Sequence, residues 1–283
     1  MASFTNFATL SYNGGTTNSN IVTGEILEAL TAVKTAVSAN YSAGDRITYA
    51  LSLVNTGTAA VTDYTVTDNL GGYTVGANTV YPLAYNAGTV RYYINGVLQT
   101  APTVTAGPPL TVTGLTVPAG GSAVLIYETT ATPVAPLATG SSITNTATIT
   151  GGGLTTPITA QATVETANSA DLTISKALSP TTVTENGRIT YTFVISNTGN
   201  TEATATGNVV VTDTFAPILR NIAVTYNGTA WTEGTNYTYN AATGVFTTLA
   251  GQITVPAALF TQNTDGTFTV TPGTATLVIT GTI

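Results

Sequence analysis

The amino-acid sequence predicts an all-β protein: two immunoglobulin-like β-sandwich domains preceded by an N-terminal donor strand or hairpin. Only 7% of its 283 residues are charged, whereas an average soluble domain has about 25%. Threonine, valine, isoleucine and tyrosine, which favour strands, are abundant. Apolar and polar residues alternate with period two, as in residues 47–53, and Asn-Gly or Asn-Thr-Gly turns separate such segments. Many short strands at this spacing are typical of β-sandwiches.

An internal repeat divides the chain into two homologous domains. Residues 43–61 (AGDRITYALSLVNTGTAAV) match residues 185–203 (ENGRITYTFVISNTGNTEA), 142 positions further along. VTDNL at 66–70 similarly matches VTDTF at 211–215. We therefore predict an N-terminal donor segment (1–28), a complete first domain (29–166) and an incomplete second domain (167–283).

The second domain lacks a hairpin that the first contains. After Thr130 the first domain continues through two predicted strands, at 141–153 and 156–165. Residues 269–283 resemble 116–130, so the second domain ends at Ile283, the position matched to Thr130. A sandwich without these strands exposes part of its core and an unpaired edge.

A relative of the missing hairpin stands at the other end of the chain. Residues 4–15 (FTNFATLSYNGG) resemble 143–153 (ITNTATITGGG), and a second strand candidate follows at 20–28. Supplying this strand to a neighbouring chain would be donor-strand complementation. Because donor and acceptor lie at opposite ends, the contact is heterologous and can propagate into a filament. The alternative is that the hairpin folds back onto its own second domain. The predicted donor face consists of Phe4, Asn6, Ala8 and Leu10.

Strand parity places polar residues on apolar faces in both domains. The only two lysines, Lys34 and Lys176, occupy equivalent repeat positions, and each shares its face with apolar neighbours. The same parity test selects one aspartate and one asparagine for each sandwich. The first domain would enclose Lys34, Asp68 and Asn145, and the second Lys176, Asp213 and Asn6 of the next chain.

Such a set of side chains can react. Desolvation favours the neutral amine of a lysine, which is a nucleophile, and the protonated form of a carboxylic acid, which can hydrogen-bond to an amide carbonyl. Attack of the amine on the asparagine amide would release ammonia and leave an isopeptide bond. Confinement in a packed core supplies the effective molarity that this slow reaction needs. We expect bonds Lys34–Asn145 within a chain and Lys176–Asn6 between chains.

Two alternatives stand beside this chemistry. The triad could be an ordinary buried Lys–Asp ion pair that is hydrogen-bonded to Asn. Glu128 could serve as the acid in the first domain, but its matched position is Gly281, so the aspartates are preferred.

The chain resembles a bacterial and archaeal surface repeat domain of unknown function. The resemblance covers nearly the whole chain in two copies, and it rests on the order of four motifs: GDRITY, Asn-Thr-Gly, VTD and ITNTAT. The triads also resemble those of self-crosslinking isopeptide domains in Gram-positive surface proteins and pili. In those domains a lysine on the first strand joins an asparagine on a late strand beside a carboxylic acid. The resemblance implies an immunoglobulin-like, pilin-like structural protein.

Composition excludes several function classes. The chain has no histidine and no cysteine, so the common zinc, haem and iron–sulfur ligand sets and Ser-His or Cys-His nucleophile pairs are absent. We expect no cofactor, no metal and no enzyme activity beyond single-turnover self-crosslinking. A net charge of −7 argues against nucleic-acid binding. No apolar run approaches the ~20 residues of a membrane span.

The sequence thus predicts a structural fibre subunit whose partner is another copy of itself. The fold indicates an extracellular location on a cell or spore surface, although no signal peptide is visible. The protein would be processed after export or released by lysis, as spore appendages are. The alternative is a monomeric adhesin or carbohydrate-binding module, in which an aromatic cluster stacks on a surface glycan. That cluster consists of Tyr226, Trp231, Tyr237 and Tyr239.

Overall fold

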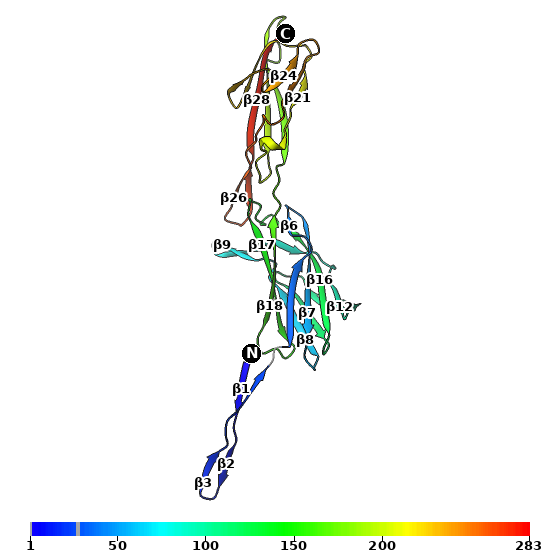
Figure 1. Ribbon diagram of the computed structural model, residues 1–283, viewed down its shortest axis with the longest axis vertical. Coiled ribbons are helices and arrows are strands. Elements are labelled where there is room, and N and C mark those ends of the chain that lie inside the picture. Colours follow the sequence, from blue (N-terminus) through cyan, green and yellow to red (C-terminus); the bar gives the residue numbers. More distant parts are fainter. Residues whose placement is uncertain (1, 27–28) are drawn as a thin grey trace.

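The computed structural model describes residues 2–26 and 29–283, and it confirms the all-β prediction. The molecule is elongated, and the tip of the N-terminal hairpin and the C-terminus lie at its opposite ends (Figure 1). In the described part of the chain, no helix is both long and apolar enough to cross a bilayer.

The N-terminal segment is a hairpin that projects away from both sandwiches (Figure 1). β1 pairs with β4 and β2 with β3, and residues 4–23 are exposed throughout. This conformation differs from the alternative in which the hairpin folds back onto its own second domain. Its strands are β1 (Ala2–Asn6), β2 (Thr9–Tyr12), β3 (Gly15–Asn18) and β4 (Val22–Ile26).

The first domain is a sandwich of two six-stranded sheets. One has the order β13-β12-β16-β7-β5, with β11 also paired to β16, and the other has the order β14-β15-β8-β17-β18-β6. Alternate residues of β7 and β16 point inward and are buried, as expected for strands with one face on a core. The strands are β5 (Leu30–Ala36), β6 (Asn40–Tyr41), β7 (Arg46–Asn55), β8 (Val61–Asp68), β9 (Tyr73–Val75), β10 (Asn78–Val80), β11 (Leu83–Tyr85), β12 (Arg91–Ile94), β13 (Val97–Leu98), β14 (Thr103–Thr105), β15 (Leu110–Val117), β16 (Ser122–Ala131), β17 (Ser142–Gly151) and β18 (Ile158–Thr166).

The second domain has its own core but a smaller second sheet. A five-stranded sheet, β19-β20-β28-β22-β23, faces a three-stranded sheet, β21-β25-β24, and β26 and β27 form a separate hairpin. Within the described chain, this domain contains no strands in the places that β17 and β18 take in the first. Its elements are β19 (Leu172–Ser179), β20 (Arg188–Asn197), the 3-10 helix η1 (Ala205–Gly207), β21 (Thr212–Thr214), β22 (Arg220–Tyr226), β23 (Thr229–Trp231), β24 (Tyr237–Asn240), β25 (Val245–Thr248), β26 (Leu259–Gln262), β27 (Phe268–Thr271) and β28 (Gly273–Thr282).

Strand register corrects the alignment of the last matched strand. Tyr127 of β16 lies opposite Tyr49 of β7. In the second domain Tyr191, the repeat counterpart of Tyr49, lies opposite Ile279 of β28. The structural counterpart of Tyr127 is therefore Ile279, one position earlier than the sequence match placed it.

The hairpin β26–β27 accounts for this shift. Val117 pairs with Val61 in the first domain, and Val255 pairs with Ala203, the repeat counterpart of Val61, in the second. The sequence TVPA at 254–257 is therefore the structural counterpart of TVPA at 116–119, and residues 258–272, which contain β26 and β27, lie between it and β28. The counterpart of Glu128 is consequently Thr280 rather than Gly281. The chain ends at the counterpart of Ala131 rather than of Thr130.

Side-chain hydrogen bonds at two places connect the two domains. Gln262 of β26 donates its amide N–H to the hydroxyl of Tyr73 at 2.9 Å, and the second place is the loop that contains Asn200. The side-chain amide of Asn200 donates to the backbone carbonyls of Leu137 and Ala167, both at 2.9 Å. The hydroxyl of Thr139 donates to the backbone carbonyl of Asn200 at 2.5 Å. These bonds fix the loop after β20 against the end of the first domain.

Candidate functional site

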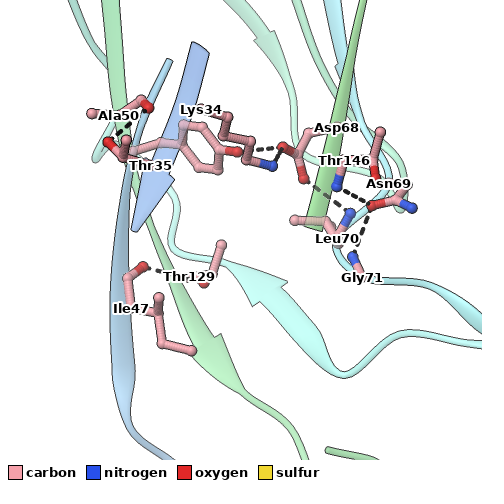
Figure 2. Close-up of polar contacts among 11 residues, drawn as sticks. Lys34, Thr35, Ile47, Ala50, Asp68, Asn69, Leu70, Gly71, Thr129 and Thr146 are labelled. Atoms are coloured by element: carbon pink, nitrogen blue, oxygen red, sulfur yellow. Dashed lines mark hydrogen bonds and ion pairs between the residues drawn. The ribbon is translucent and has the colours of Figure 1, made fainter. Parts of the chain in front are cut away.

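The first triad lies in the core of the first domain. Lys34 on β5 reaches across the sandwich to Asp68 at the end of β8, and its Nζ lies 2.5 Å from Asp68 Oδ2 (Figure 2). The side chains are 0% and 1% exposed. The other oxygen, Oδ1, accepts the backbone N–H of Leu70 at 2.9 Å. Burial lowers the pKa of Lys34 from 10.5 to about 8, against the opposing effect of Asp68. A substantial fraction of the amine is therefore neutral near pH 8.

Asn145 shares this core face. β17 pairs with β8 so that Ala147 lies opposite Asp68, which makes Asn145 a diagonal neighbour of the carboxylate on the same face. Asn145 is fully buried. Its side chain interacts with the hydroxyls of Tyr49 and Tyr127, and it opposes the rise in their pKa values. Among the described residues it makes no hydrogen bond to Lys34 or Asp68, the contacts that an ordinary hydrogen-bonded triad would contain.

Two tyrosines complete the site, and strand parity alone did not single them out. The rings of Tyr49 and Tyr127 stack with their centroids 5.8 Å apart, and Lys34 Nζ lies 4.8 Å from the centroid of Tyr49. The Tyr127 hydroxyl donates to Asp68 Oδ2, the oxygen that also contacts Lys34. Burial, reinforced by Asp68, raises the pKa of both phenols far above the ordinary value. Tyr49 lies on β7, which pairs with the Lys34 strand, and Tyr127 lies on β16, which pairs with β7. A search of the inward positions on these two strands would have found both.

The second triad is open on one side. Lys176 on β19 pairs with Asp213 on β21, but their side chains are 41% and 18% exposed. On the same face of β19, Ile174 is 55% exposed, whereas its repeat counterpart Ala32 in the first domain is half-buried. The second domain therefore leaves an apolar face uncovered beside the lysine, and we call this uncovered face the groove.

The edge that borders this groove is also unpaired. In the first domain β8 pairs with both β15 and β17, and it runs for 8 residues. Its counterpart β21 has 3 residues and, among the described strands, pairs only with β25. The segment before it, at 209–211, has no strand structure.

Around Asn6, the strands β1 and β4 of the N-terminal hairpin pair as β17 and β18 of the first domain pair around Asn145. Asn145 of β17 lies opposite Ala162 of β18, and the flanking pair is Thr144 with Thr163. In the N-terminal hairpin Asn6 lies opposite Val22, and the flanking pair is Thr5 with Thr23. The donor-face residues Phe4, Asn6, Ala8 and Leu10 are all exposed. The strand β1 lies on the far side of the first domain from the second (Figure 1), so one chain does not bring Asn6 to Lys176.

Glu128, the alternative acid for the first domain, lies outside the core. Glu128 neighbours Tyr127 on β16 and therefore points to the opposite face. There its carboxylate lies 3.7 Å from the guanidinium of Arg46, with the two side chains 37% and 77% exposed. Asp68 is the carboxylate that contacts Lys34.

The aromatic cluster of the second domain is mostly internal packing. Tyr226 is buried and stacks on Trp231 with centroids 4.8 Å apart, and its hydroxyl donates to the Thr254 carbonyl at 2.5 Å. Tyr237 is buried, and the Tyr239 hydroxyl donates to a backbone carbonyl at 2.8 Å. These rings fill the sandwich and do not form an exposed stacking platform.

No protein-family model matches the chain, and no curated protein matches it. Its structural neighbours are pilins and surface adhesins of Gram-positive bacteria. BcpA, the major pilin subunit of Bacillus cereus, is 14% identical with a TM-score of 0.36, and the match covers 96% of this chain and 73% of that one. RrgB, the pilus backbone of Streptococcus pneumoniae, is 13% identical with a TM-score of 0.36, covering 86% and 55%.

A C-terminal fragment of the major pilin GBS80 of Streptococcus agalactiae is 12% identical with a TM-score of 0.36, and the match covers 55% of this chain and 66% of the fragment. The chain therefore spans between about half and three quarters of the length of these three structures. At such identities the similarity concerns the fold alone.

Proposed function

We propose that the protein is the structural subunit of an extracellular fibre on a cell or spore surface, and that it polymerises head to tail by donor-strand complementation. One observation carries this proposal. The second domain is open where β17 and β18 close the first, and β1 and β4 of the exposed N-terminal hairpin pair around Asn6 as β17 and β18 pair around Asn145. Filling the groove would bury the apolar donor face and pair an unpaired edge, and both changes favour association.

The first domain supplies a template for the contact between chains. There Ala147 lies opposite Asp68 and Ile149 opposite Val66. The same register places Ala8 of an incoming chain opposite Asp213, and its Leu10 opposite the residue two positions before Asp213. Asn6 then becomes a diagonal neighbour of Asp213 on the face that carries Lys176.

Each completed site would form an isopeptide bond. The neutral Lys34 amine attacks Cγ of Asn145, the new C–N bond forms, and the original C–NH₂ bond breaks with release of ammonia. Asp68 takes the proton from the attacking amine and delivers it to the departing nitrogen, so it is unchanged at the end. Lys176, Asp213 and Asn6 of the next chain would react in the same way, locking each subunit contact covalently.

Electron microscopy and heating in detergent test this function together. Purified wild-type protein should form filaments that give a ladder of multimers after boiling in detergent. Asn6→Ala keeps Phe4, Ala8 and Leu10, so it should still form filaments, but boiling should reduce them to monomers. Lys176→Ala should behave identically.

Lys34→Ala is the matched control because it removes the equivalent lysine of the closed domain. It should leave the ladder intact. Wild-type filaments that dissolve wholly to monomers would disprove the covalent contact, and wild-type protein that stays monomeric would disprove the assembly.

A further inference from the structure

The acids of the two triads have different partners. Asp68 Oδ2 contacts both Lys34 Nζ and the Tyr127 hydroxyl, while its Oδ1 accepts a backbone N–H from Leu70. Asp213 has the corresponding lysine and one backbone donor, the N–H of Thr214 at 2.9 Å. Among the described residues no phenol donates to Asp213, because the position of Tyr127 is taken by Ile279.

We propose that Tyr127 is a positioning residue for the Lys34–Asn145 reaction, and that its absence from the second domain makes the bond between chains form more slowly than the bond within a chain. This inference rests on the proposed crosslinking. It goes beyond it by assigning the two chemically similar sites different rates.

The geometry gives the reason. A carboxylate that shuttles a proton must keep one oxygen directed at the attacking amine. Donors on both oxygens of Asp68, one of them on the oxygen that faces Lys34, oppose rotation of the carboxylate about its Cβ–Cγ bond. The phenol stays protonated and so remains a donor, because burial raises the pKa of Tyr127 well above its ordinary value. Asp213 is partly exposed and has no side-chain donor other than Lys176 among the described residues.

The two rates set an order of events. The first domain locks during or soon after folding. A docked neighbour, in contrast, remains held by strand pairing and apolar contacts for a period before its bond forms. A chain bound in the wrong register can dissociate within that period, so slow chemistry at the subunit contact favours regular filaments.

The inference can be tested by placing a tyrosine at position 279 of the second domain, the counterpart of Tyr127. The hairpin contributes no residue to either core, so a chain of residues 29–283 keeps both cores and an open groove. Mixed with a peptide of residues 1–28, it should form a covalent adduct whose mass is one ammonia below the sum. Ile279→Tyr should raise the maximal rate of adduct formation about tenfold or more, a change expected when one interaction is added in the transition state.

Ile279→Phe is the matched control, because it adds a ring of the same size without the hydroxyl. The peptide concentration that gives half-maximal rate should be alike in the two variants, since a purely structural effect would alter binding instead. In the full-length chain Tyr127→Phe should slow ammonia loss from the first domain, measured by intact mass of a proteolytic fragment at intervals after refolding.

The outcomes separate the two proposals. Equal maximal rates for Ile279→Tyr and Ile279→Phe, with wild-type kinetics for Tyr127→Phe, would overturn the role of Tyr127 while leaving crosslinking in place. If neither variant tolerates the larger ring, the Tyr127→Phe rate decides alone. Absence of ammonia loss from the wild-type protein at both sites would overturn the crosslinking and this role with it.

Discussion

The two sandwiches have the same triad positions but different completeness, and the difference shows what buries a lysine. The side chain of Lys34 is 0% exposed in the closed domain, whereas that of Lys176 is 41% exposed in the open one. Both lie on the same face of equivalent strands. The strand that carries the lysine therefore sets its direction only. The hairpin that covers it sets its solvation, and with solvation the reactivity of its amine.

The largest expected effect comes from deleting residues 1–28, which removes the donor. The shortened chain should be a soluble monomer, because every groove stays open while no donor remains. Size-exclusion chromatography with light scattering measures this directly. Adding the 1–28 peptide should occupy the groove without restoring polymers, and polymers formed by the shortened chain alone would show that assembly uses another surface.

Removing each acid should affect the two domains very differently. Asp68→Ala leaves the buried Lys34 ammonium without its partner and prevents the crosslink, so we expect a loss of about 3–5 kcal/mol from the free energy of unfolding of the first domain. Asp213→Ala affects a partly exposed pair, and we expect about 1 kcal/mol or less. Urea unfolding of monomeric chains lacking residues 1–28 gives both values. Similar losses would mean that the open groove does not hydrate Lys176.

The pH dependence of the first domain should reveal whether its lysine has reacted. In Asn145→Ala the amine stays free, with its pKa lowered from 10.5 when unfolded to about 8 when folded. Between these values the unfolded chain binds more protons than the folded one, so stability should rise with pH from about 8 to 10.5, by at most about 3 kcal/mol. In the crosslinked wild-type domain the amine is an amide, and this rise should be missing. A wild-type domain that shows the same rise would contain a free Lys34.

We expect the smallest effect from Glu128→Gln, a variant that tests whether Asp68 or Glu128 is the acid in the crosslinking of the first domain. Its exposed pairing with Arg46 contributes about 1 kcal/mol or less, and it faces away from Lys34. The first domain of this variant should lose ammonia as completely as the wild type. Intact mass of the first-domain fragment is the measurement, and retained ammonia would make Glu128 part of the chemistry.

Period-two alternation carried most of the correct predictions. It placed Lys34, Asp68 and Asn145 on inward faces, and the structure buries all three. Such alternation determines which face a side chain occupies, because neighbouring residues of a strand point to opposite sides. It contains no information about which strands become neighbours, so the contact between Tyr127 and Asp68 was not predicted.

Two features of the structure could not be predicted from sequence motifs. The shift of β28 by one residue follows from the β26–β27 hairpin, which separates β28 from the TVPA segment at 254–257, and the similarity of 269–270 to 116–117 concealed it. The aromatic residues around Trp231 were equally compatible with a sugar platform and with packing, since both uses place rings on adjacent strands. The predicted boundary between the donor segment and the first domain falls at residues 27–28, outside the described residues.

The hydrogen bonds of Asn200 affect where the proposed filament can bend. The repeat counterpart of Asn200 at the base of the first domain is Thr58, which has no side-chain amide. A contact between subunits would therefore lack the side-chain amide that donates to Leu137 and Ala167 within one subunit. We expect such a fibre to bend more readily at the contacts between subunits than between the two domains of one subunit, and the spacing of bends in micrographs of curved filaments would show this.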